Sequence, residues 1–256
     1  MRWGSSSIVP IVIFASSACT RFDADSAPDA GADAGVVSEG PVGDGAVDKP
    51  EPKVVTCGAA ASFCEDFDGA LSITDVLSRF TAGNGEGNLS LFKYGANQGL
   101  RATLGPGETV ATLIHQSANK RPAEVIVEVD VRPQKVAGPI GLFSLDYWSR
   151  LPPTNRFLKG LGVVVRADGR VSLDAGANKI DTGFTMTTGQ WHKLRLIAPT
   201  GVARADLEID GNRYTNTQVY LDGAVGEFQL AFGPYLEIAT GSEQSVEYDN
   251  LRVSAR

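Results

Sequence analysis

Polar and apolar residues alternate most regularly between residues 189 and 214. Apolar side chains take every second position of residues 194–198 and again of residues 203–209, and a Pro-Thr-Gly sequence separates the two runs. Because successive side chains of a strand point to opposite faces, this spacing predicts a β-hairpin with one buried face. The Asp-Gly-Asn sequence at residues 210–212 favours a tight reversal into a third antiparallel strand, since these residue types tolerate positive φ angles.

The clearest single strand is residues 123–133, which place four valines on one face and mostly charged side chains on the other. We expect Pro133 to end this strand, because proline cannot donate to a central sheet ladder. Further runs predict strands at residues 88–94, 100–104, 109–115, 140–148, 161–167, 170–174, 227–232 and 245–254. We find no helical period and no internal repeat. About a dozen short strands separated by turn signals predict an all-β fold, a two-sheet antiparallel β-sandwich or jelly roll.

The N-terminus has the pattern of an export signal. Arg2 precedes an apolar run at residues 8–14, and small residues lead directly to Cys19. This run is too short for a permanent membrane-spanning helix, so we interpret residues 1–18 as a signal peptide. Small residues before a cysteine resemble the bacterial lipoprotein signal, which implies that Cys19 is lipidated after cleavage; the alternative is simple secretion. Thr20, in place of Asp, resembles the sorting pattern for the outer membrane.

Residues 19–56 are rich in Asp, Ala, Gly and Pro, and Phe22 is their only aromatic residue. Such a segment buries too little apolar surface to offset the entropy of ordering, so we predict a disordered linker. As a random coil it would hold its ends roughly 30–40 Å apart, enough to keep a domain away from a lipid surface. Its Asp-Ala-Gly composition resembles the tethers of surface lipoproteins from myxobacteria and their relatives.

Much of the negative charge lies in the same linker. The chain has a formal net charge of -7, and residues 20–56 hold eight acidic side chains against three basic ones. The remaining residues, 57–256, are nearly balanced, with 22 acidic and 19 basic side chains. Neither part offers the basic surface that nucleic-acid binding requires.

Cys57 and Cys64 bracket the start of the expected domain. In an exported protein, two cysteines at a domain edge favour a disulfide bond. A redox-active or zinc-binding pair is the alternative, but the two-residue spacing and a nearby histidine are both missing. We therefore expect a Cys57–Cys64 disulfide at the entrance of a domain that spans residues 57–256.

Four short motifs follow one another along this domain. They are C-E-D-F-D-G at residues 64–69, V-E-V-D-V-R-P at 127–133, G-Q-W-H-K-L at 189–194 with I-D-G at 209–211, and Y-D-N-L-R-V at 248–253. In order and spacing they resemble the concanavalin A-like and laminin-G-like jelly-roll superfamily, and the resemblance covers essentially residues 57–256. It implies a two-sheet sandwich with a ligand-binding outer surface.

The resemblance also implies a structural calcium ion. In this superfamily such an ion often ties the first strand to the last, through a carboxylate of the closing strand and backbone carbonyls. Asp249 occupies the matching place, and Asp66 or Asp68 could supply a second carboxylate, because Ca²⁺ prefers oxygen ligands. The alternative is that these acids cap turns and face water.

A catalytic site is not expected. Retaining β-glucanases of the superfamily carry a Glu-x-Asp motif followed by a second Glu on one strand, and Glu128 and Asp130 match its first two positions. Arg132 and Pro133 stand where the second Glu should be, and Glu124 lies on the wrong side of the pair. The two histidines of the chain, His115 and His192, do not neighbour a G-x-S-x-G elbow, so we expect both to be structural or surface residues.

Carbohydrate recognition would use an exposed aromatic side chain flanked by polar groups. The best aromatic candidate is Trp148, which shares a strand face with Asp146. We expect these two residues to lie in the same sheet as Glu128, Asp130 and Arg132. The alternative is that Trp148 packs under the loop of residues 149–159. Trp191 and Tyr248 are expected in the core.

Together these features predict a non-catalytic lipoprotein of the outer membrane or cell surface. Its jelly roll would bind a polysaccharide or a protein component of an extracellular surface. The alternatives are a polysaccharide hydrolase or lyase with the same fold, and a purely structural envelope protein. For location, the alternatives are the periplasm and secretion.

Overall fold

In a computed structural model, the chain is described at residues 61–116, 122–149, 156–175, 178–220 and 228–256. All of these residues belong to one compact unit, Ala46–Arg256. The predicted signal peptide, linker, Cys19 and Cys57 lie outside the described residues. The disulfide between Cys57 and Cys64 and the lipid on Cys19 therefore stay predictions. Within the described ranges, no helix has the length and apolar character needed to cross a membrane.

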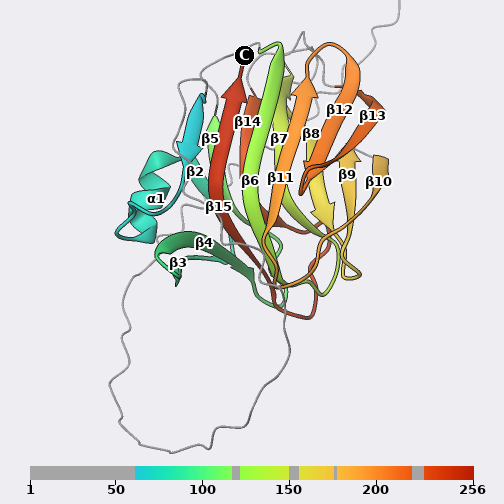
Figure 1. Ribbon diagram of the computed structural model, residues 1–256. Coiled ribbons are helices and arrows are strands. Elements are labelled where there is room, and N and C mark those ends of the chain that lie inside the picture. Colours follow the sequence, from blue (N-terminus) through green and yellow to red (C-terminus); the bar gives the residue numbers. More distant parts are fainter. Residues whose placement is uncertain (1–60, 117–121, 150–155, 176–177, 221–227) are drawn as a thin grey trace, which may run out of the picture. The chain divides into compact units, whose positions relative to one another are not determined.

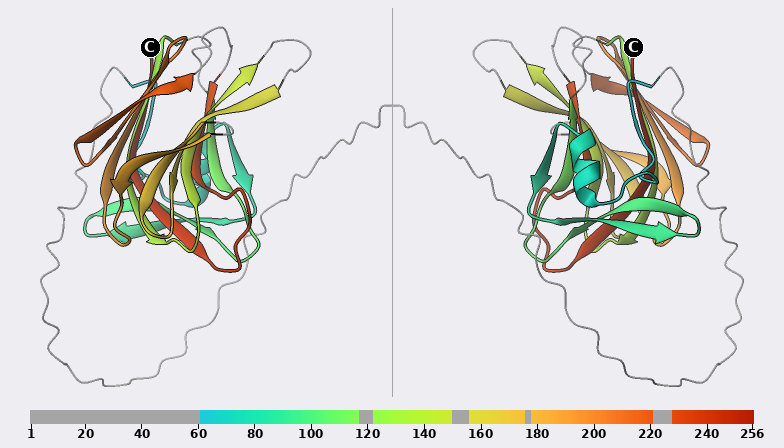
Figure 2. Two further views of the ribbon diagram at one scale, coloured as in Figure 1. Left: turned by 90° about the vertical axis from the view of Figure 1, so that its right-hand side faces the viewer. Right: turned by 90° about the vertical axis from the view of Figure 1, so that its left-hand side faces the viewer.

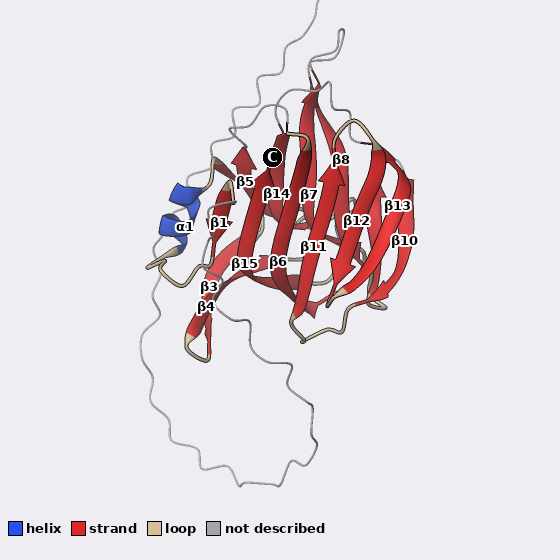
Figure 3. Cartoon of the chain, turned by 45° about the horizontal axis from the view of Figure 1, so that its top comes forward, coloured by secondary structure: helices blue, strands red, loops and turns tan. Residues whose placement is uncertain are grey.

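Two antiparallel sheets pack face to face, which confirms the predicted β-sandwich (Figures 1 and 3). Sheet A has the strand order β13-β12-β11-β6-β15-β4-β3, and β1 also pairs with β15. Its strands are β1 (Phe63–Glu65), β3 (Asn88–Tyr94), β4 (Asn97–Leu104), β6 (Glu124–Lys135), β11 (His192–Pro199), β12 (Ala203–Ile209), β13 (Asn212–Tyr220) and β15 (Gln244–Ala255).

Sheet B has the order β10-β9-β8-β7-β14-β5-β2. Its strands are β2 (Ala82–Gly85), β5 (Ala111–Gln116), β7 (Ile140–Ser149), β8 (Arg156–Val165), β9 (Arg170–Ala175), β10 (Asn178–Thr185) and β14 (Phe228–Tyr235). The sequence pattern missed β10, in which most described side chains are exposed or partly exposed and no regular alternation results.

The core lies between the sheets and follows the predicted alternation. The valine face of β6 is buried, and it packs beside the apolar face of β11 through eight paired positions. Tyr248 of β15 inserts its ring into the core, with its centroid 4.6 Å from that of Phe232 in the opposite sheet. Its hydroxyl donates to the backbone oxygen of Leu142 at 3.0 Å, which satisfies a buried polar group and links the two layers.

The hairpin predicted at residues 194–209 is present as β11 and β12, with Leu196 opposite Leu207. The reversal into β13 also forms as predicted. Asp210 and Gly211 have φ angles of 51° and 82°, which is the left-handed conformation that an Asp-Gly hairpin turn requires.

One helix contradicts the expectation that the domain has none. Helix α1, Ile73–Arg79, begins at Ser72, whose side chain accepts a hydrogen bond from the Asp75 amide at 3.3 Å. The helix buries Val76, and Figure 2 (right) shows it at the open edge between the two layers. The sequence pattern missed it because seven residues give only two turns and therefore no resolvable helical period.

Candidate ligand-binding site

The predicted ligand face is divided between two sheets. Glu128, Asp130 and Arg132 lie on β6 in sheet A, whereas Asp146 and Trp148 lie on β7 in sheet B. The expectation of one shared sheet was therefore wrong. Alternation along a strand assigns side chains to a face, but pairing with distant strands decides the sheet, and β6 pairs with β11 and β15 while β7 pairs with β8 and β14. The structure describes the backbone of Trp148 and not its side chain.

Glu128 is held by two arginines on the outer face of sheet A. Its carboxylate lies 3.2 Å from Arg195 Nε and 3.9 Å from Arg252 Nη1. Arg195 also contacts Glu208 on the neighbouring strand β12, at 3.2 Å. Glu128, which matched the first position of the glucanase motif, thus belongs to a ladder of ion pairs that crosses the sheet.

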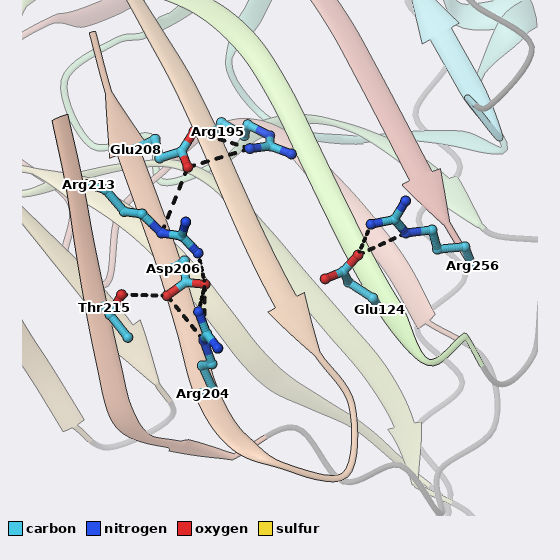
Figure 4. Close-up of polar contacts among 8 residues, drawn as sticks. All are labelled: Glu124, Arg195, Arg204, Asp206, Glu208, Arg213, Thr215 and Arg256. Atoms are coloured by element: carbon cyan, nitrogen blue, oxygen red, sulfur yellow. Dashed lines mark hydrogen bonds and ion pairs between the residues drawn. The ribbon is translucent and has the colours of Figure 1, made fainter. Parts of the chain in front are cut away.

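The ladder ends at Asp206, which is 2 % exposed (Figure 4). Arg204, Arg213 and Thr215 all donate to its carboxylate, at distances between 2.6 and 3.3 Å. Burial acts to raise the pKa of Asp206, but the hydroxyl of Thr215 and the two guanidinium groups outweigh burial and hold the pKa below its usual range. The charges of this half of the face are therefore paired with one another, four arginines with three carboxylates.

Arg132 belongs to a second cluster, centred on Glu247 of β15. Glu247 has no exposed surface, and it accepts hydrogen bonds from Arg101, Arg132 and Gln134 at 2.5 to 2.9 Å. The pairings of Glu247 with Arg101 on β4 and with Arg132 on β6 place all three charges in one row across the sheet. The side chains of Arg101 and Arg132 are 46 % and 21 % exposed.

Three partly exposed aromatic rings lie beside this row, and we call Phe92, Tyr94 and Trp191 the aromatic patch. The ring centroid of Tyr94 is 5.4 Å from that of Phe92 and 5.2 Å from that of Trp191. The guanidinium of Arg132 lies 4.8 Å from the Trp191 ring centroid and 5.7 Å from that of Phe92, and Arg101 lies 5.2 Å from Phe92. These are cation–π distances.

The expectation that Trp191 belongs to the core was wrong. The next residue, His192, is buried and pairs with Val131, so strand alternation turns Trp191 to the outer face beside Arg132. The sequence had placed an indole, that of Trp148, on the same face as Asp130 and Arg132. In the structure the indole on this face is that of Trp191, which precedes β11 of sheet A. Both ring nitrogens of His192 are engaged, by the Thr187 amide at 2.9 Å and by Asp210 at 2.8 Å, as expected of a structural histidine.

A pair of carboxyl groups completes the face. Asp130 and Asp249 are opposite each other on β6 and β15, and the Asn250 side-chain amide donates to Asp130 at 2.8 Å and to Asp249 at 3.1 Å. A β-bulge follows Asp249, and Asn250 adopts a φ angle of 52°, which asparagine tolerates better than most residues. Tyr94 of the aromatic patch donates its hydroxyl to Asp249.

Burial is the main cause of the unusual titration of this pair. It raises the pKa of Asp249 to about 7, with the charges of Asp68 and Asp130 acting in the same direction and the hydrogen bonds from Tyr94 and the Asn250 amide opposing it. Burial likewise raises the pKa of Asp130. Both carboxyls therefore hold their protons to a higher pH than ordinary aspartates.

Two of the three candidate calcium ligands, Asp68 and Asp249, are engaged in hydrogen bonds. Asp68 accepts from the Gln98 amide at 2.6 Å, and Asp249 accepts from Tyr94 and from the Asn250 amide. No group of three or more metal-ligating side chains occurs among the residues that the structure describes. The first strand, β1, does pair with the last, β15, as the resemblance implied, and a calcium ion between them stays a prediction.

The outer face of sheet B carries a site that the sequence analysis missed. Tyr235 of β14 lies across Gly141 and Gly162, where an added Cβ atom would come within 2.1 Å of the tyrosine side chain. Burial, followed by the charges of Asp174, Asp146 and Glu237, raises the pKa of Tyr235. The signal in the sequence was glycine in the interior of two neighbouring strands, which marks a place where a large group packs closely.

Comparison with known proteins identifies the fold and no family. Neither the family models nor the curated proteins include a match. An alginate lyase from Aplysia kurodai aligns with a TM-score of 0.63 and 12% identity over 77% of this chain and 100% of its own. A carbohydrate esterase from a Shiga toxin-encoding bacteriophage aligns with a TM-score of 0.55 and 14% identity over 78% of this chain and 100% of its own. A sialidase aligns at 0.58 and 15% identity over 77% of this chain, which corresponds to 19% of the sialidase. At these identities the likeness shows the fold alone, and the described domain is a two-sheet antiparallel jelly-roll sandwich.

Proposed function

We propose that this protein is a non-catalytic carbohydrate-binding lipoprotein of the cell envelope and that the sugar contacts the outer face of sheet A. One observation carries the proposal: the aromatic patch offers three partly exposed rings within 6.4 Å of one another, next to the carboxyls of Asp130 and Asp249. Sugar rings stack their C–H faces on aromatic side chains, and their hydroxyls pair with carboxylates and amides.

The patch is well suited to binding because its side chains are already fixed. Arg132 packs over Trp191 and Phe92, and Tyr94 is tied to Asp249. A ligand that binds here does not have to immobilise these side chains, so less of the contact free energy is lost to ordering them.

The names of the structural neighbours support a carbohydrate as the ligand class. The first three are an alginate lyase, a sialidase and a carbohydrate esterase. Lipidation at Cys19 and the linker of residues 19–56 would display the sandwich at the outer membrane or cell surface.

Absence of catalysis is part of the proposal. A retaining glycosidase needs a nucleophile and an acid about 5 Å apart. Glu128 is paired with Arg195 and Arg252, and Glu247 is buried beneath two arginines. Between them on this face, Asp130 and Asp249 share one donor, the Asn250 amide, and Asp249 is 2 % exposed. These arrangements support binding without cleavage.

A polysaccharide lyase or hydrolase is the second candidate, with Tyr235 as the reacting group on sheet B. Its position next to Asp146 and Asp174 favours a polar site there, and the fold is shared with alginate lyases. A lyase base must be ionised near neutral pH, whereas burial and the two carboxylates raise the pKa of Tyr235. These surroundings make the tyrosine a poor base, so binding without turnover is the better-supported function.

The test is a glycan array probed with purified full-length protein and two variants. Trp191→Ala removes the ring of the aromatic patch that lies nearest to Arg132, and Trp148→Ala removes the indole of sheet B that was the aromatic candidate in the sequence. We expect Trp191→Ala to lose at least tenfold in affinity and Trp148→Ala to bind like the wild type. The reverse result would place the ligand on sheet B.

Turnover of any bound polymer is measured in parallel, by release of reducing ends or of unsaturated sugars. Turnover that disappears in Tyr235→Phe would establish the enzyme and overturn the non-catalytic proposal. If the protein neither binds nor cleaves any glycan, a structural role in the envelope is the alternative that remains.

A further inference from the structure

Two arginines share one buried carboxylate at the border of the aromatic patch. Glu247 is fully buried and forms hydrogen bonds with Arg101, Arg132 and Gln134. One negative charge between two positive ones leaves a local charge of plus one beside the aromatic patch. Because Glu247 already has three partners, its lone pairs are largely used.

Both guanidinium groups keep donors for another partner. Arg101 binds Glu247 through Nε and Nη2, and Arg132 binds it through Nε. In the part of the chain that the structure describes, the remaining N–H groups of these two arginines have no other hydrogen bond, and the side chains are 46 % and 21 % exposed. A guanidinium presents its donors in a planar fork that fits a carboxylate or a sulfate.

The aromatic rings hold these forks in place. Arg132 is fixed from one side by Glu247 and packs over two rings of the patch, and Arg101 packs over Phe92. An anion bound at the outer edge of Arg132 would therefore lie next to Trp191. A sugar ring that carries such an anion could stack on the patch while its acid group pairs with the arginines.

The surroundings favour an anion at this place. Lys193 is exposed on the neighbouring strand β11, where it is paired with Asp130 on the same face as Arg132. The neighbouring carboxyls, Asp130 and Asp249, both accept hydrogen bonds from the Asn250 side-chain amide.

On sheet B the charges that act on Tyr235 are those of Asp174, Asp146 and Glu237, and Glu237 pairs with Lys179 at 2.5 Å. The two aspartates disfavour an acidic polymer at that place.

We propose that Arg101 and Arg132 form an anion subsite and that the ligand of the aromatic patch is a polysaccharide bearing carboxylate or sulfate groups. This inference rests on the proposed function, because the anion is recognised together with the sugar ring that carries it.

The test compares polymers that differ only in charge. Purified full-length protein is titrated with polygalacturonate and with its fully methyl-esterified form, and separately with dextran sulfate and dextran. We expect the charged polymer of at least one pair to bind ten times more tightly than its neutral partner. The preference should fall as salt is added, because exposed charges are screened.

Two variants and a matched control assign the preference to the subsite. Arg132→Gln should reduce the ratio of charged-polymer to neutral-polymer affinity about tenfold, because lost packing over Trp191 affects both polymers and lost charge affects only the charged one. Arg101→Gln, at the more exposed position, should act in the same direction. Arg256→Gln removes a charge of the same face that pairs with Glu124 outside the patch, and it should leave the preference unchanged. Thermal unfolding verifies that each variant is folded.

The outcomes separate the two proposals. If neutral and charged forms bind equally and both depend on Trp191, the carbohydrate-binding function stands and the anion subsite is wrong. If Arg256→Gln lowers the preference as much as Arg132→Gln, the effect is general charge and the subsite is also wrong. If no glycan binds at all, both proposals fail. The two polymer pairs distinguish a carboxylate ligand from a sulfate ligand.

Discussion

Asp249 lies opposite Asp130 in the ladder between β15 and β6, and a single amide, that of Asn250, binds both carboxyls. Two acids held this closely out of water disfavour full ionisation, and burial raises the pKa of Asp249 to about 7. The groups that face this pair are Tyr94 from β3, Lys193 from β11, Asp210 from the turn after β12, and Asp68 from the segment before α1. The result is a proton site next to the aromatic patch.

Asp249 should make the domain less stable as pH rises. An unfolded aspartate has a pKa of about 3.9, so between about pH 4 and pH 7 the folded state binds the proton and the unfolded state does not. The free energy of unfolding therefore falls through this window, by about 1–4 kcal/mol in total for this group. Asp249→Asn should remove the fall, measured by urea unfolding at pH 5 and pH 8.

His115 contributes a pH dependence of stability opposite to that of Asp249. Burial lowers the pKa of His115, so its protonation opposes folding, and the free energy of unfolding falls as pH drops below about 6.5. Subtracting the free energy of unfolding of Asp249→Asn from that of the wild type at each pH removes the His115 contribution, because both proteins contain His115. The free energy of unfolding changes between pH 5 and pH 8 by some amount in the wild type. If it changes by the same amount in Asp249→Asn, Asp249 ionises normally.

Two ion pairs on the same face should differ widely in energy (Figure 4). Asp206 is buried beneath three donors, so Asp206→Asn should lower the free energy of unfolding by about 1–3 kcal/mol. Glu124 pairs at 2.6 Å with Arg256, whose side chain is 72 % exposed, so Glu124→Gln should cost only about 0–1 kcal/mol. Denaturant unfolding at low and high salt measures both. If Asp206→Asn and Glu124→Gln lower the free energy of unfolding equally, the ladder of ion pairs is not a stabilising element of the sheet.

The packing of Tyr235 over the glycines of sheet B gives a steric prediction. Gly162→Ala would place a Cβ atom 2.1 Å from the tyrosine hydroxyl, and relieving the overlap should cost about 1–3 kcal/mol. Gly69→Ala is the control, because an added Cβ there meets nothing within 4 Å. Thermal unfolding of the two variants should separate them by several degrees. Equal melting temperatures would mean that Tyr235 is free to move away.

The sequence predicted the strands and the local hairpin partners of β11, β12 and β13 well, and the partners of distant strands poorly. Residues 88–94 form β3 as expected, and the valine face of residues 125–131 is buried, because both patterns depend on neighbouring positions only. The assignment of β6 and β7 to one sheet failed, since pairing is decided by strands more than fifty residues away.

The aromatic patch was hidden for a related reason. Phe92 and Tyr94 come from β3, and Trp191 precedes β11, so nothing local in the sequence indicates that the three rings meet. The charged residues Asp130 and Arg132 were found because they alternate with buried valines on a single strand. A site built from several strands becomes visible only when the register of the sheet is known.

Glu247 should act on stability and on binding in opposite directions. Glu247→Gln leaves Arg101 and Arg132 beside a neutral amide, and loss of a buried, fully hydrogen-bonded charge should lower the free energy of unfolding by about 2–4 kcal/mol. The same change raises the local charge of the anion subsite from one to two, so affinity for a carboxylated or sulfated polymer should increase.

Glu243→Gln is the control for Glu247→Gln, because both partners of its pair with Lys135 are exposed, and neither stability nor affinity should change by much. Calorimetric titration and denaturant unfolding of the same samples measure the two effects. A variant that loses stability and also loses affinity for the charged polymer would show that Glu247 positions the arginines for binding more than it competes with the ligand for them.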